Sequence, residues 1–458
     1  MAKSPSVVAQ AAGHGAPPAV RENWLLGSTR AMRRDPLSLM LGAAQRYGDV
    51  VRLRMLLWPF YLVSSTEGVQ RVLQEHHPNY NKDVIDYRLL RTFLGRGLLT
   101  DDGESWLRQR RLIQPAFHRQ RLAAFGKLMA SATTALLARW DALDPDGPLD
   151  VAHEMMRLTQ RIVGLALFSI DLSAEAETIG GAFTTLNTLI TDYSYMPFPP
   201  LAVPTPRNRR LTGAAATLES AVRAIIAARR EREDDPADLL SLLLAARDAD
   251  TGEGMPDDQV RDEVMTLLLA GHETTANLLA WTWYLLARHP EAERRLHDEL
   301  DAVLAGEAPS VDRLAELPYT RMVLDETLRL YPPAWIITRN AIAADAIAGY
   351  TVPAGAAIIL SPYVTHRLPA YWDDPDAFDP ERFTPERVAA RPRFAYFPFG
   401  GGPRQCIGNG FALMEAQIAL ATIAQRYRLR ALPGRAIEPE PLITLRPHGG
   451  LPMLLERR

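Results

Sequence analysis

Cysteine is almost absent from this sequence, because Cys406 is the only one among 458 residues. A single thiol cannot form an internal disulfide, so a secreted fold held together by disulfides is excluded. Lysine is also scarce, with three among 51 basic residues, and we interpret this bias as genome composition. An excess of one charge is lacking too, since 51 basic and 54 acidic residues give a net charge of -3. We therefore expect no general affinity for nucleic acid or for an anionic membrane.

Long uninterrupted hydrophobic runs are missing as well. The N-terminus has no basic start followed by an apolar stretch, so we expect neither a signal peptide nor a membrane anchor. The longest apolar stretch, residues 264–287, is interrupted by His272, Glu273 and Asn277, which would be costly in lipid. We predict that it is a core helix of a cytoplasmic protein and that residues 1–22 form a flexible tail.

Helical periodicity dominates the rest of the chain, while strand signals are few. Residues 50–65 alternate around Trp58-Pro59 and predict a hairpin, and residues 349–363 predict two short strands. Periodicity predicts helices over residues 103–119, 120–143, 151–169, 208–233, 258–289, 290–305 and 318–330. The apolar, proline-rich residues 196–206 predict a rigid loop. We therefore expect residues 23–458 to form a single, mainly α domain with small β-sheets.

The segment around the only thiol, FPFGGGPRQCIGNGFALMEAQIALA (397–421), is the most informative part of the sequence. Glycines and Pro403 prevent a helix before Cys406, and residues 411–421 predict an amphipathic helix after it. At such a junction, backbone N–H groups and the positive end of the helix favour a thiolate. Glycines also allow the backbone to approach a flat group closely. A lone cysteine is more often a buried free thiol, but this loop meets the needs of a thiolate that ligates haem iron.

The pattern Phe399-x-x-Gly402-x-Arg404-x-Cys406-x-Gly408 resembles the signature of the cytochrome P-450 family, the haem-thiolate monooxygenases. Three further motifs follow in the family's order, and the resemblance runs from about residue 35 to the C-terminus. It implies the cytochrome P-450 fold, with haem b (iron protoporphyrin IX) between the long central helix and the helix after the cysteine. It also implies that Cys406 ligates the iron and that further residues bind the haem, namely Phe399, Gly400, Gly408, Ala270 and Gly271.

The second motif, Ala270-Gly271-His272-Glu273-Thr274-Thr275, lies midway along the helix predicted over 258–289. Gly271 lacks a side chain and Thr274 can bond back to the carbonyl of Ala270, which together predict a local opening of the helix. The resemblance assigns Thr274 a hydrogen bond to activated oxygen and Glu273 the delivery of protons. From these residues alone, a polar helix face formed by His272 and Glu273 is the alternative. A zinc protease of the H-E-x-x-H type is excluded, because residue 276 is alanine.

The remaining motifs combine arginines with acidic or aromatic partners. Glu326-x-x-Arg329 puts opposite charges on one helix face, and the resemblance implies a buried pair completed by Arg382 rather than a surface ion pair. Trp106-x-x-x-Arg110 places two donors one turn apart, suited to the carboxylates of haem propionates. By resemblance, the further propionate partners are Arg339 and Arg404.

The resemblance implies a monooxygenase that inserts one oxygen atom of O2 into a C–H or C=C bond of a lipophilic substrate, either a fatty acid or a terpenoid or carotenoid. The chain has no glycine fingerprint for a flavin or nicotinamide, so a separate ferredoxin or flavodoxin with its reductase is expected to supply electrons. The basic run 106–121 is a candidate docking surface for that donor, or merely a solvated helix face. We expect a monomer. By family analogy, apolar residues line the substrate pocket, among them Tyr193, Phe198, Leu268 and Trp335.

Two other classes of function account for fewer of these residues. A non-catalytic haem sensor or carrier would share the thiolate ligand, yet it would not need Gly271, Glu273 and Thr274. A hydrolase with a cysteine nucleophile would need a base near Cys406, and no motif supplies one.

Overall fold

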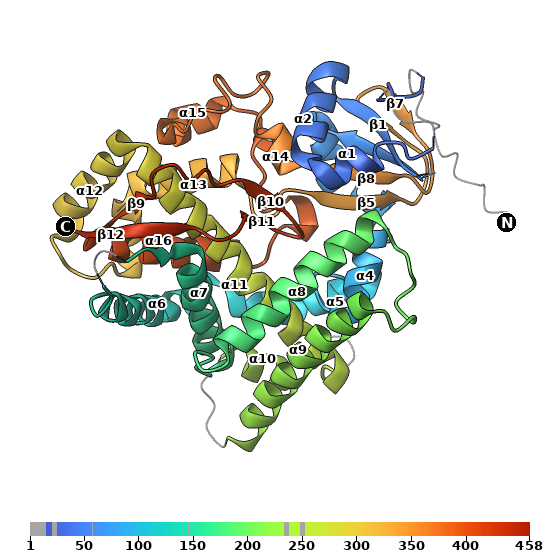
Figure 1. Ribbon diagram of the computed structural model, residues 1–458. Coiled ribbons are helices and arrows are strands. Elements are labelled where there is room, and N and C mark those ends of the chain that lie inside the picture. Colours follow the sequence, from blue (N-terminus) through green and yellow to red (C-terminus); the bar gives the residue numbers. More distant parts are fainter. Residues whose placement is uncertain (1–14, 21–24, 57, 145–146, 233–237, 248–251) are drawn as a thin grey trace, which may run out of the picture. The chain divides into compact units, whose positions relative to one another are not determined.

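The computed structural model describes residues 15–20, 25–56, 58–144, 147–232, 238–247 and 252–458. The chain forms two compact units, which we treat separately. The first unit comprises Met1–Val84, Ile336–Trp372 and Pro392–Gln405, and the second comprises Ile85–Trp335, Asp373–Arg391 and Cys406–Arg458. Figure 1 labels many of the elements of both units.

The first unit is built on a five-stranded sheet with the order β1-β2-β8-β5-β3. Strands β1 and β2 form the predicted hairpin, β2 pairs with β8 in parallel, and the remaining pairs are antiparallel. The five strands are β1 (Val50–Met55), β2 (Trp58–Val63), β3 (Tyr80–Asn81), β5 (Ile337–Ala341) and β8 (Ala357–Leu360). The unit also contains β6 (Asp345–Ile347), β7 (Tyr350–Val352), α1 (Thr29–Arg34), α2 (Pro36–Tyr47), α3 (Thr66–Gln70) and α14 (Pro362–Thr365).

Part of the segment predicted as a flexible tail is attached to this sheet. The N–H of Val20 donates to the carbonyl of Arg52 (3.1 Å), and the N–H of Arg52 donates to the carbonyl of Pro18 (2.8 Å). Backbone pairing with an edge strand therefore fixes Pro18–Val20, which corrects the predicted tail at this point. The predicted tail residues 1–14 and 21–22 lie outside the described residues.

The second unit contains most of the helices and two small sheets. Its sheets have the orders β4-β12-β9 and β10-β11. These strands are β4 (Leu149–Asp150), β9 (Tyr427–Ala431), β10 (Pro439–Pro441), β11 (Leu445–Pro447) and β12 (Pro452–Arg457). Its helices are α4 (Ile85–Leu94), α5 (Gly103–Ile113), α6 (Arg119–Trp140), α7 (Val151–Phe168), α8 (Ala176–Tyr195), α9 (Pro206–Glu231), α10 (Leu239–Ala245), α11 (Asp257–Arg288), α12 (Pro290–Leu304), α13 (Pro318–Leu330), α15 (Pro385–Ala390) and α16 (Asn409–Ala424).

Helix α11 is the core helix that the sequence predicts. Its 32 residues correspond to a length of about 48 Å at 1.5 Å per residue. It packs most extensively against α7 and also contacts α9, α13 and α16. Because neighbours cover it on several sides, nearly all of its residues between Val264 and Leu286 are buried. This burial explains why the sequence is apolar around the whole helix rather than along one stripe.

Helix α16 follows the cysteine loop as predicted, but the expectation that it is amphipathic is wrong. Every residue from Met414 to Ala424 is buried. The reason is that α6, α11 and α13 all pack against this helix, which leaves no face for solvent. The cysteine loop therefore continues into one of the most deeply buried helices of the second unit.

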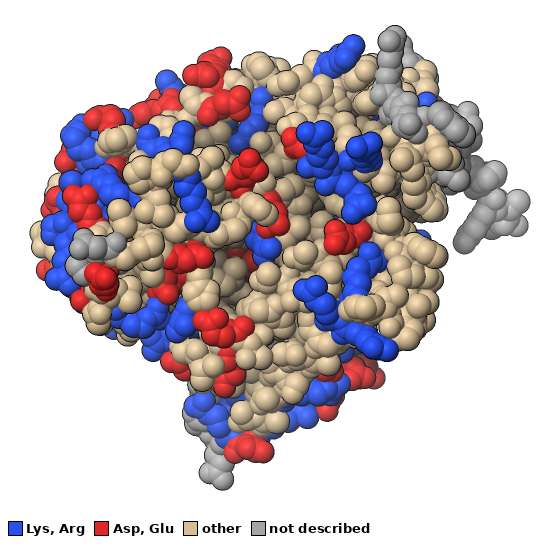
Figure 2. Space-filling view, viewed as in Figure 1, with Lys and Arg blue, Asp and Glu red and all other residues tan. Residues whose placement is uncertain are grey.

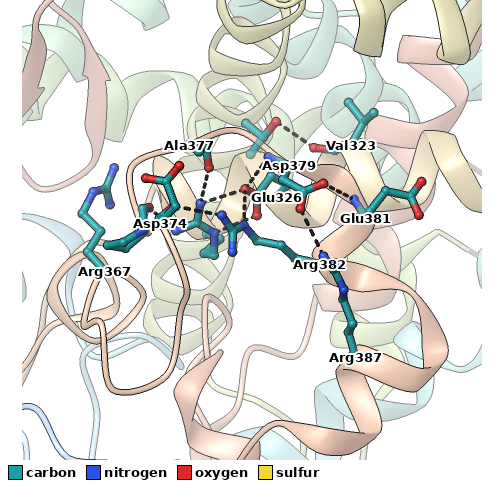
Figure 3. A network of polar contacts seen from close by, with 12 residues as sticks. Val323, Glu326, Arg367, Asp374, Ala377, Asp379, Glu381, Arg382 and Arg387 are labelled. Atoms are coloured by element: carbon teal, nitrogen blue, oxygen red, sulfur yellow. Dashed lines mark hydrogen bonds and ion pairs between the residues drawn. The ribbon is translucent and has the colours of Figure 1, made fainter.

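A buried ion pair joins α13 to the DPERF segment, as the motif predicts (Figure 3). Nε and Nη2 of Arg329 each donate to one carboxylate oxygen of Glu326, both at 2.7 Å. Nε of Arg382 lies 3.4 Å from Oε1 of Glu326, which also accepts from the N–H of Asp379 (2.9 Å). Burial raises the pKa of Glu326 and the two arginines lower it. Since Glu326 and Arg329 are inaccessible to solvent, the alternative of a surface ion pair is excluded.

The visible surface of the second unit around α12 and β12 carries interleaved acidic and basic side chains (Figure 2). Arg430 pairs with Glu293 and Glu456, and Arg458 pairs with Asp301. This mixture of charges agrees with the small net charge of the chain, and the surface around α12 and β12 carries no basic patch in this view. Among the described residues, α9 alone has the length and apolar composition of a membrane span, with 28% of that window buried. One helix of this kind is weak evidence for a membrane span, because core helices meet the same test.

Candidate functional site

The thiol of Cys406 lies in the turn just before α16. The side chain is exposed, although protein atoms surround it closely enough for burial to raise the pKa of the thiol. The N–H of Gly408 bonds to the sulfur, and the Arg110 guanidinium from α5 lies within electrostatic reach, and both of these lower that pKa. Burial outweighs them, so the predicted preference for the thiolate is not met by the protein alone. A cation bound to the sulfur would supply the missing stabilisation.

The loop that precedes Cys406 is shaped by contacts within the first unit. Gly402 has a φ of +65°, and a Cβ there would lie 1.9 Å from the carbonyl oxygen of Leu73. Glycine is therefore required at residue 402 because the backbone of Leu73 leaves no room for a side chain. This reason differs from the predicted one, which is close approach of the backbone to a flat group. The N–H of Phe397 donates to Nε2 of the buried His366 (3.0 Å), which holds the start of the loop. Phe399 and Gly400, both predicted to bind the cofactor, follow it and are half-buried.

The middle of α11 has one accessible face. Ala270 is exposed, and Gly271 and Thr274 are half-buried, in a stretch that is otherwise buried. The Oγ1 of Thr274 donates to the carbonyl of Ala270 (2.8 Å), which is the predicted bond. Small residues on this face leave room beside the helix for a ligand.

The predicted local opening of α11 is not present, because the helix is continuous from Asp257 to Arg288. Gly271 has another use in this structure. A Cβ at residue 271 would lie 3.0 Å from a methyl group of Val163, so the missing side chain lets α7 approach α11 closely. In addition, the Oγ1 of Thr159 on α7 donates to the carbonyl of His272 (2.9 Å). Glycine at residue 271 is therefore explained by the close packing of α7 and not by a local opening of α11.

His272 and Glu273 are both buried, so the alternative of a solvated polar face is excluded. Burial lowers the pKa of His272 to about 4, and its Nδ1 bonds to the carbonyl of Leu268. Its ring packs on Phe183, with 4.9 Å between the ring centroids. Burial also raises the pKa of Glu273. The Oε1 of Glu273 accepts from Asn187 (2.5 Å) and from Thr444 (2.8 Å).

Helix α16 carries a second buried carboxyl group beside the same part of α11. Glu415 is completely buried, and burial raises the pKa of its carboxyl well above the usual range. The Thr275 hydroxyl is the group that lowers this pKa, so Glu415 lies next to the residue that follows Thr274. Sequence reasoning missed Glu415, since one glutamate in an apolar helix looks like a residue on a solvent face. The pair shows that the helix after Cys406 packs on the accessible segment of α11.

The four predicted propionate partners are divided between the units. In the second unit, Trp106 is buried and Arg110 is half-buried on α5. In the first unit, Arg339 is buried on β5 and donates from Nη1 to the carbonyl of Thr338 (2.8 Å), while Arg404 is half-buried. Burial lowers the pKa of Arg110, and a nearby anion such as a carboxylate would offset that cost.

Several residues expected to line the pocket have other positions. Tyr193, Leu268 and Trp335 are each at most 2% exposed and belong to the core. The hydroxyl of Tyr193 donates to the carbonyl of Pro199 (2.8 Å), and the indole of Trp335 donates to the carbonyl of Leu442 (2.8 Å). Phe198 is 71% exposed on the α8–α9 loop. For Tyr193, Leu268 and Trp335 the reason is that apolar side chains near a site in sequence pack into the core as readily as into a pocket.

The residues that are present fit a haem. The second unit presents an accessible thiol just before α16, and α16 packs on α11. Among the described central residues of α11, Ala270, Gly271 and Thr274 form the accessible face with small side chains. Arg110 adds a half-buried cation within electrostatic reach of that thiol. A soft sulfur ligand, room for a flat group and a cation for its carboxylates are what such a cofactor requires.

Comparison with known proteins agrees with this geometry. The family model for Cytochrome P450 matches residues 17–450. Cyclooctatin synthase of Streptomyces melanosporofaciens is 40% identical over 444 residues, which cover 95% of this chain and 94% of that protein. Cyclooctat-9-en-7-ol 5-monooxygenase of the same organism is 40% identical over 438 residues, with 95% and 94% covered. Pentalenene oxygenase of Streptomyces avermitilis is 36% identical over 433 residues, with 94% of each chain covered.

Proposed function

The chain belongs to the cytochrome P450 family of haem monooxygenases, and we propose that it oxidises a cyclic terpenoid with electrons from a separate protein. One observation carries the assignment of the site. Cys406 is an accessible thiol at the start of α16, and α16 packs on the part of α11 where Ala270 and Thr274 are accessible. A thiolate ligand and an oxygen-handling hydroxyl are thereby built into two helices in contact.

Each residue has a separate task in this proposal. When bound, haem b activates dioxygen so that one oxygen atom enters a C–H or C=C bond of the substrate. Cys406 ligates the iron, and the N–H of Gly408 tempers the electron donation of the sulfur. Phe399 and Gly400 shape the loop next to the cofactor. Ala270 and Gly271 keep space beside α11.

Proton supply and cofactor orientation belong to other residues of the chain. Thr274 holds a hydroxyl at the accessible face of α11, and this O–H, which donates to the carbonyl of Ala270, can instead donate to a ligand. Glu273, buried and one residue away, stores the proton that the reaction consumes. The cofactor's carboxylates are held by four donors, namely Trp106, Arg110, Arg339 and Arg404.

The terpenoid class is favoured over the fatty acids by the relatives. The names of two of them specify terpenoids, cyclooctat-9-en-7-ol and pentalenene, and both proteins match along almost the whole chain. Leukotriene-B4 omega-hydroxylase 3 of Mus musculus, whose name specifies a leukotriene, is less similar, at 32% identity. A polycyclic hydrocarbon also suits a site whose accessible helix face consists of Ala270, Gly271 and a single hydroxyl.

The electron donor is proposed to be a ferredoxin or flavodoxin with its reductase. The basic run 106–121 is less uniform than its sequence suggests. Arg108 lies 3.8 Å from Glu253, and Arg110 lies within electrostatic reach of Cys406. Arg111 and Arg121 are exposed and would provide the positive surface for an acidic donor. We further propose that the protein works in the cytoplasm as a monomer.

The test uses haem-loaded protein and three probe compounds, each titrated separately. The first is pentalenene, the second is a cyclic diterpene alcohol, and the third is lauric acid. We expect the terpenoids to shift the haem spin state at lower concentration than lauric acid. A reconstituted ferredoxin and reductase under ¹⁸O2 should then give a product that carries one labelled oxygen. Tighter binding and faster oxidation of lauric acid would contradict the terpenoid assignment.

A non-catalytic haem sensor or carrier is the second candidate, and the same preparation separates the two. A sensor would form no labelled product with any of the three compounds, and Thr274→Ala would not alter its consumption of NADPH. A monooxygenase with this site should be sensitive to that substitution.

A further inference from the structure

The carboxyl group of Glu273 is the centre of a buried polar network that joins three segments distant in sequence. Asn187 comes from α8, Thr444 lies in the turn between β10 and β11, and Asn277 lies one turn further along α11. Each of these four residues is at most 7% exposed. All of them belong to the second unit. Polar groups that are buried so completely destabilise the folded protein unless they form hydrogen bonds.

The directions of the hydrogen bonds follow from the chemistry of the groups. The N–H of Ile443 donates to Oδ1 of Asn187 (2.8 Å), which turns the Asn187 amide NH2 towards Glu273 (2.5 Å) and Thr444 (3.4 Å). The hydroxyl of Thr444 also accepts from Nδ2 of Asn277 (3.2 Å). Its single proton is therefore directed to Oε1 of Glu273, 2.8 Å away. The donor and the acceptor of each hydrogen bond in this network are therefore assigned.

This arrangement gives the two oxygens of Glu273 different roles. Asn187 and Thr444 both bond to Oε1, which leaves Oε2 as the oxygen that would carry the proton when the carboxyl is protonated. The charged group that faces the carboxyl is Arg446 of β11, which is itself bonded to Glu440 (2.8 Å). His272, the neighbouring titratable residue on α11, points to the carbonyl of Leu268. The carboxyl is thus held by neutral donors and not by a direct ion pair.

We propose that Asn187 and Thr444 are positioning residues that fix Oε1 of Glu273 and leave Oε2 to deliver protons beside Thr274. The inference rests on the proposed function and deepens it. Because α8 and the β10–β11 turn supply the two donors, the acid is correctly placed only while both segments are packed at α11. Proton supply is then available when these segments are in place and fails when either of them moves away.

The first test measures coupling, the amount of product formed per NADPH, with pentalenene as the probe. Asn187→Leu and Thr444→Val each remove one donor to Oε1 at nearly constant volume. Coupling is expected to fall roughly threefold to tenfold in each, with a larger solvent isotope effect, because general acid catalysis depends on placement. Thr444→Ser restores the hydroxyl and should restore coupling. Thr188→Ala is the matched control on α8, because Thr188 is half-buried and its hydroxyl donates to the carbonyl of Thr184 in the same helix.

The second test does not depend on turnover. Infrared difference spectra of the haem-loaded protein, with Glu273→Gln as reference, identify the carbonyl stretch of the protonated Glu273. Loss of a donor to Oε1 should shift this band to higher frequency in Asn187→Leu and Thr444→Val and leave it in place in Thr188→Ala. An unshifted band in both variants would overturn the proposed hold on the carboxyl. A shifted band with unchanged coupling would overturn its role in proton supply.

The two tests also separate this inference from the proposed function. If the protein gives no oxidised product from any terpenoid or fatty acid, the proposed function fails, whereas the infrared band still reports whether Asn187 and Thr444 hold Glu273. The reduced carbon monoxide spectrum of each variant shows that the haem pocket has folded, so a shifted band cannot be attributed to unfolding.

Discussion

At the scale of single residues, the hydroxyl of Thr274 is the polar group best placed to act on a ligand at α11. It is half-buried at the accessible face of α11 and bonds to the carbonyl of Ala270 at 2.8 Å. Its neighbour Thr275 faces the other way, towards Glu415 on α16. Two adjacent threonines therefore have different surroundings, and only Thr274 adjoins the space for a ligand.

We expect Thr274→Ala to uncouple the reaction without unfolding the protein. The stability cost should stay below about 1 kcal/mol, because one bond within a helix is lost at a half-buried position. Coupling of NADPH to product should fall about tenfold or more, with peroxide released instead. The measurement is product, peroxide and NADPH in the same reaction. Full coupling in Thr274→Ala, or a loss of coupling in Thr274→Ser equal to that in Thr274→Ala, would refute the assigned role.

At the scale of elements, α13 and the DPERF segment are held together by one buried charge cluster (Figure 3). Arg329 gives two bonds to Glu326 and two more to the carbonyls of Pro375 and Ala377. Glu326 and Arg329 are paired through two hydrogen bonds, and pairing is the condition under which buried charges are tolerated. Its role is to fix how these two segments meet.

Glu326→Gln should therefore be strongly destabilising even though it keeps size and shape. The change leaves Arg329 and Arg382 buried without their counter-charge, at an expected cost of about 3–5 kcal/mol. Glu386→Gln, an exposed change on α15, is the matched control and should have almost no effect. Urea unfolding followed by circular dichroism measures both. Equal midpoints for the two variants would show that the cluster has no structural role.

The cysteine loop depends on Gly402 for a reason that lies within the first unit. We expect Gly402→Ala to disturb the loop, because its Cβ would collide with the carbonyl oxygen of Leu73 and its φ of +65° disfavours a side chain. The fraction of haem retained on purification should fall several-fold. Gly355→Ala has a similar strain, with φ +74° but open space around it, and so isolates the effect of the collision. Equal haem retention in the two variants would contradict this account.

At the scale of the whole molecule, local sequence signals predict the helices well and the polar contacts poorly. Helix α11 and the β1–β2 hairpin match their predicted ranges within a few residues. Helix α5 ends at Ile113, short of the predicted 119, because Pro115 has no N–H to continue it. Helices α2, α4, α8 and α10 have no predicted counterpart, and in α8 glycines and threonines weaken the helical pattern.

The limits of prediction at the site follow from distance along the chain. The roles of Cys406 and Thr274 are expected from short motifs, whereas the partners of Glu273 lie 86 and 171 residues away and belong to no motif. Gly271 and Gly402 show a related limit. Their residue type is visible in the sequence, but the neighbour that requires it, Val163 or Leu73, is known only from the fold.

The acid stability of the whole protein should depend on His297. Burial and nearby Arg458, Arg428 and Arg430 lower its pKa to about 4, although Asp301 opposes them. The unfolded chain binds this proton at the ordinary pKa near 6.5, so the free energy of unfolding falls as the pH drops from about 6.5 to 4. The contribution is at most about 3 kcal/mol, because solvent screening reduces the effect of the charges around the imidazole. Urea midpoints of His297→Gln should fall less than those of the wild type over this range, and parallel curves would contradict the assignment.

The central claim is that Cys406 ligates haem iron as a thiolate, and the absorbance of the reduced protein with carbon monoxide tests it most directly. The account predicts a far red-shifted Soret band for the wild type and its loss in Cys406→Ser. A wild-type band at the position of histidine-ligated haem, or an unchanged spectrum in Cys406→Ser, would contradict it.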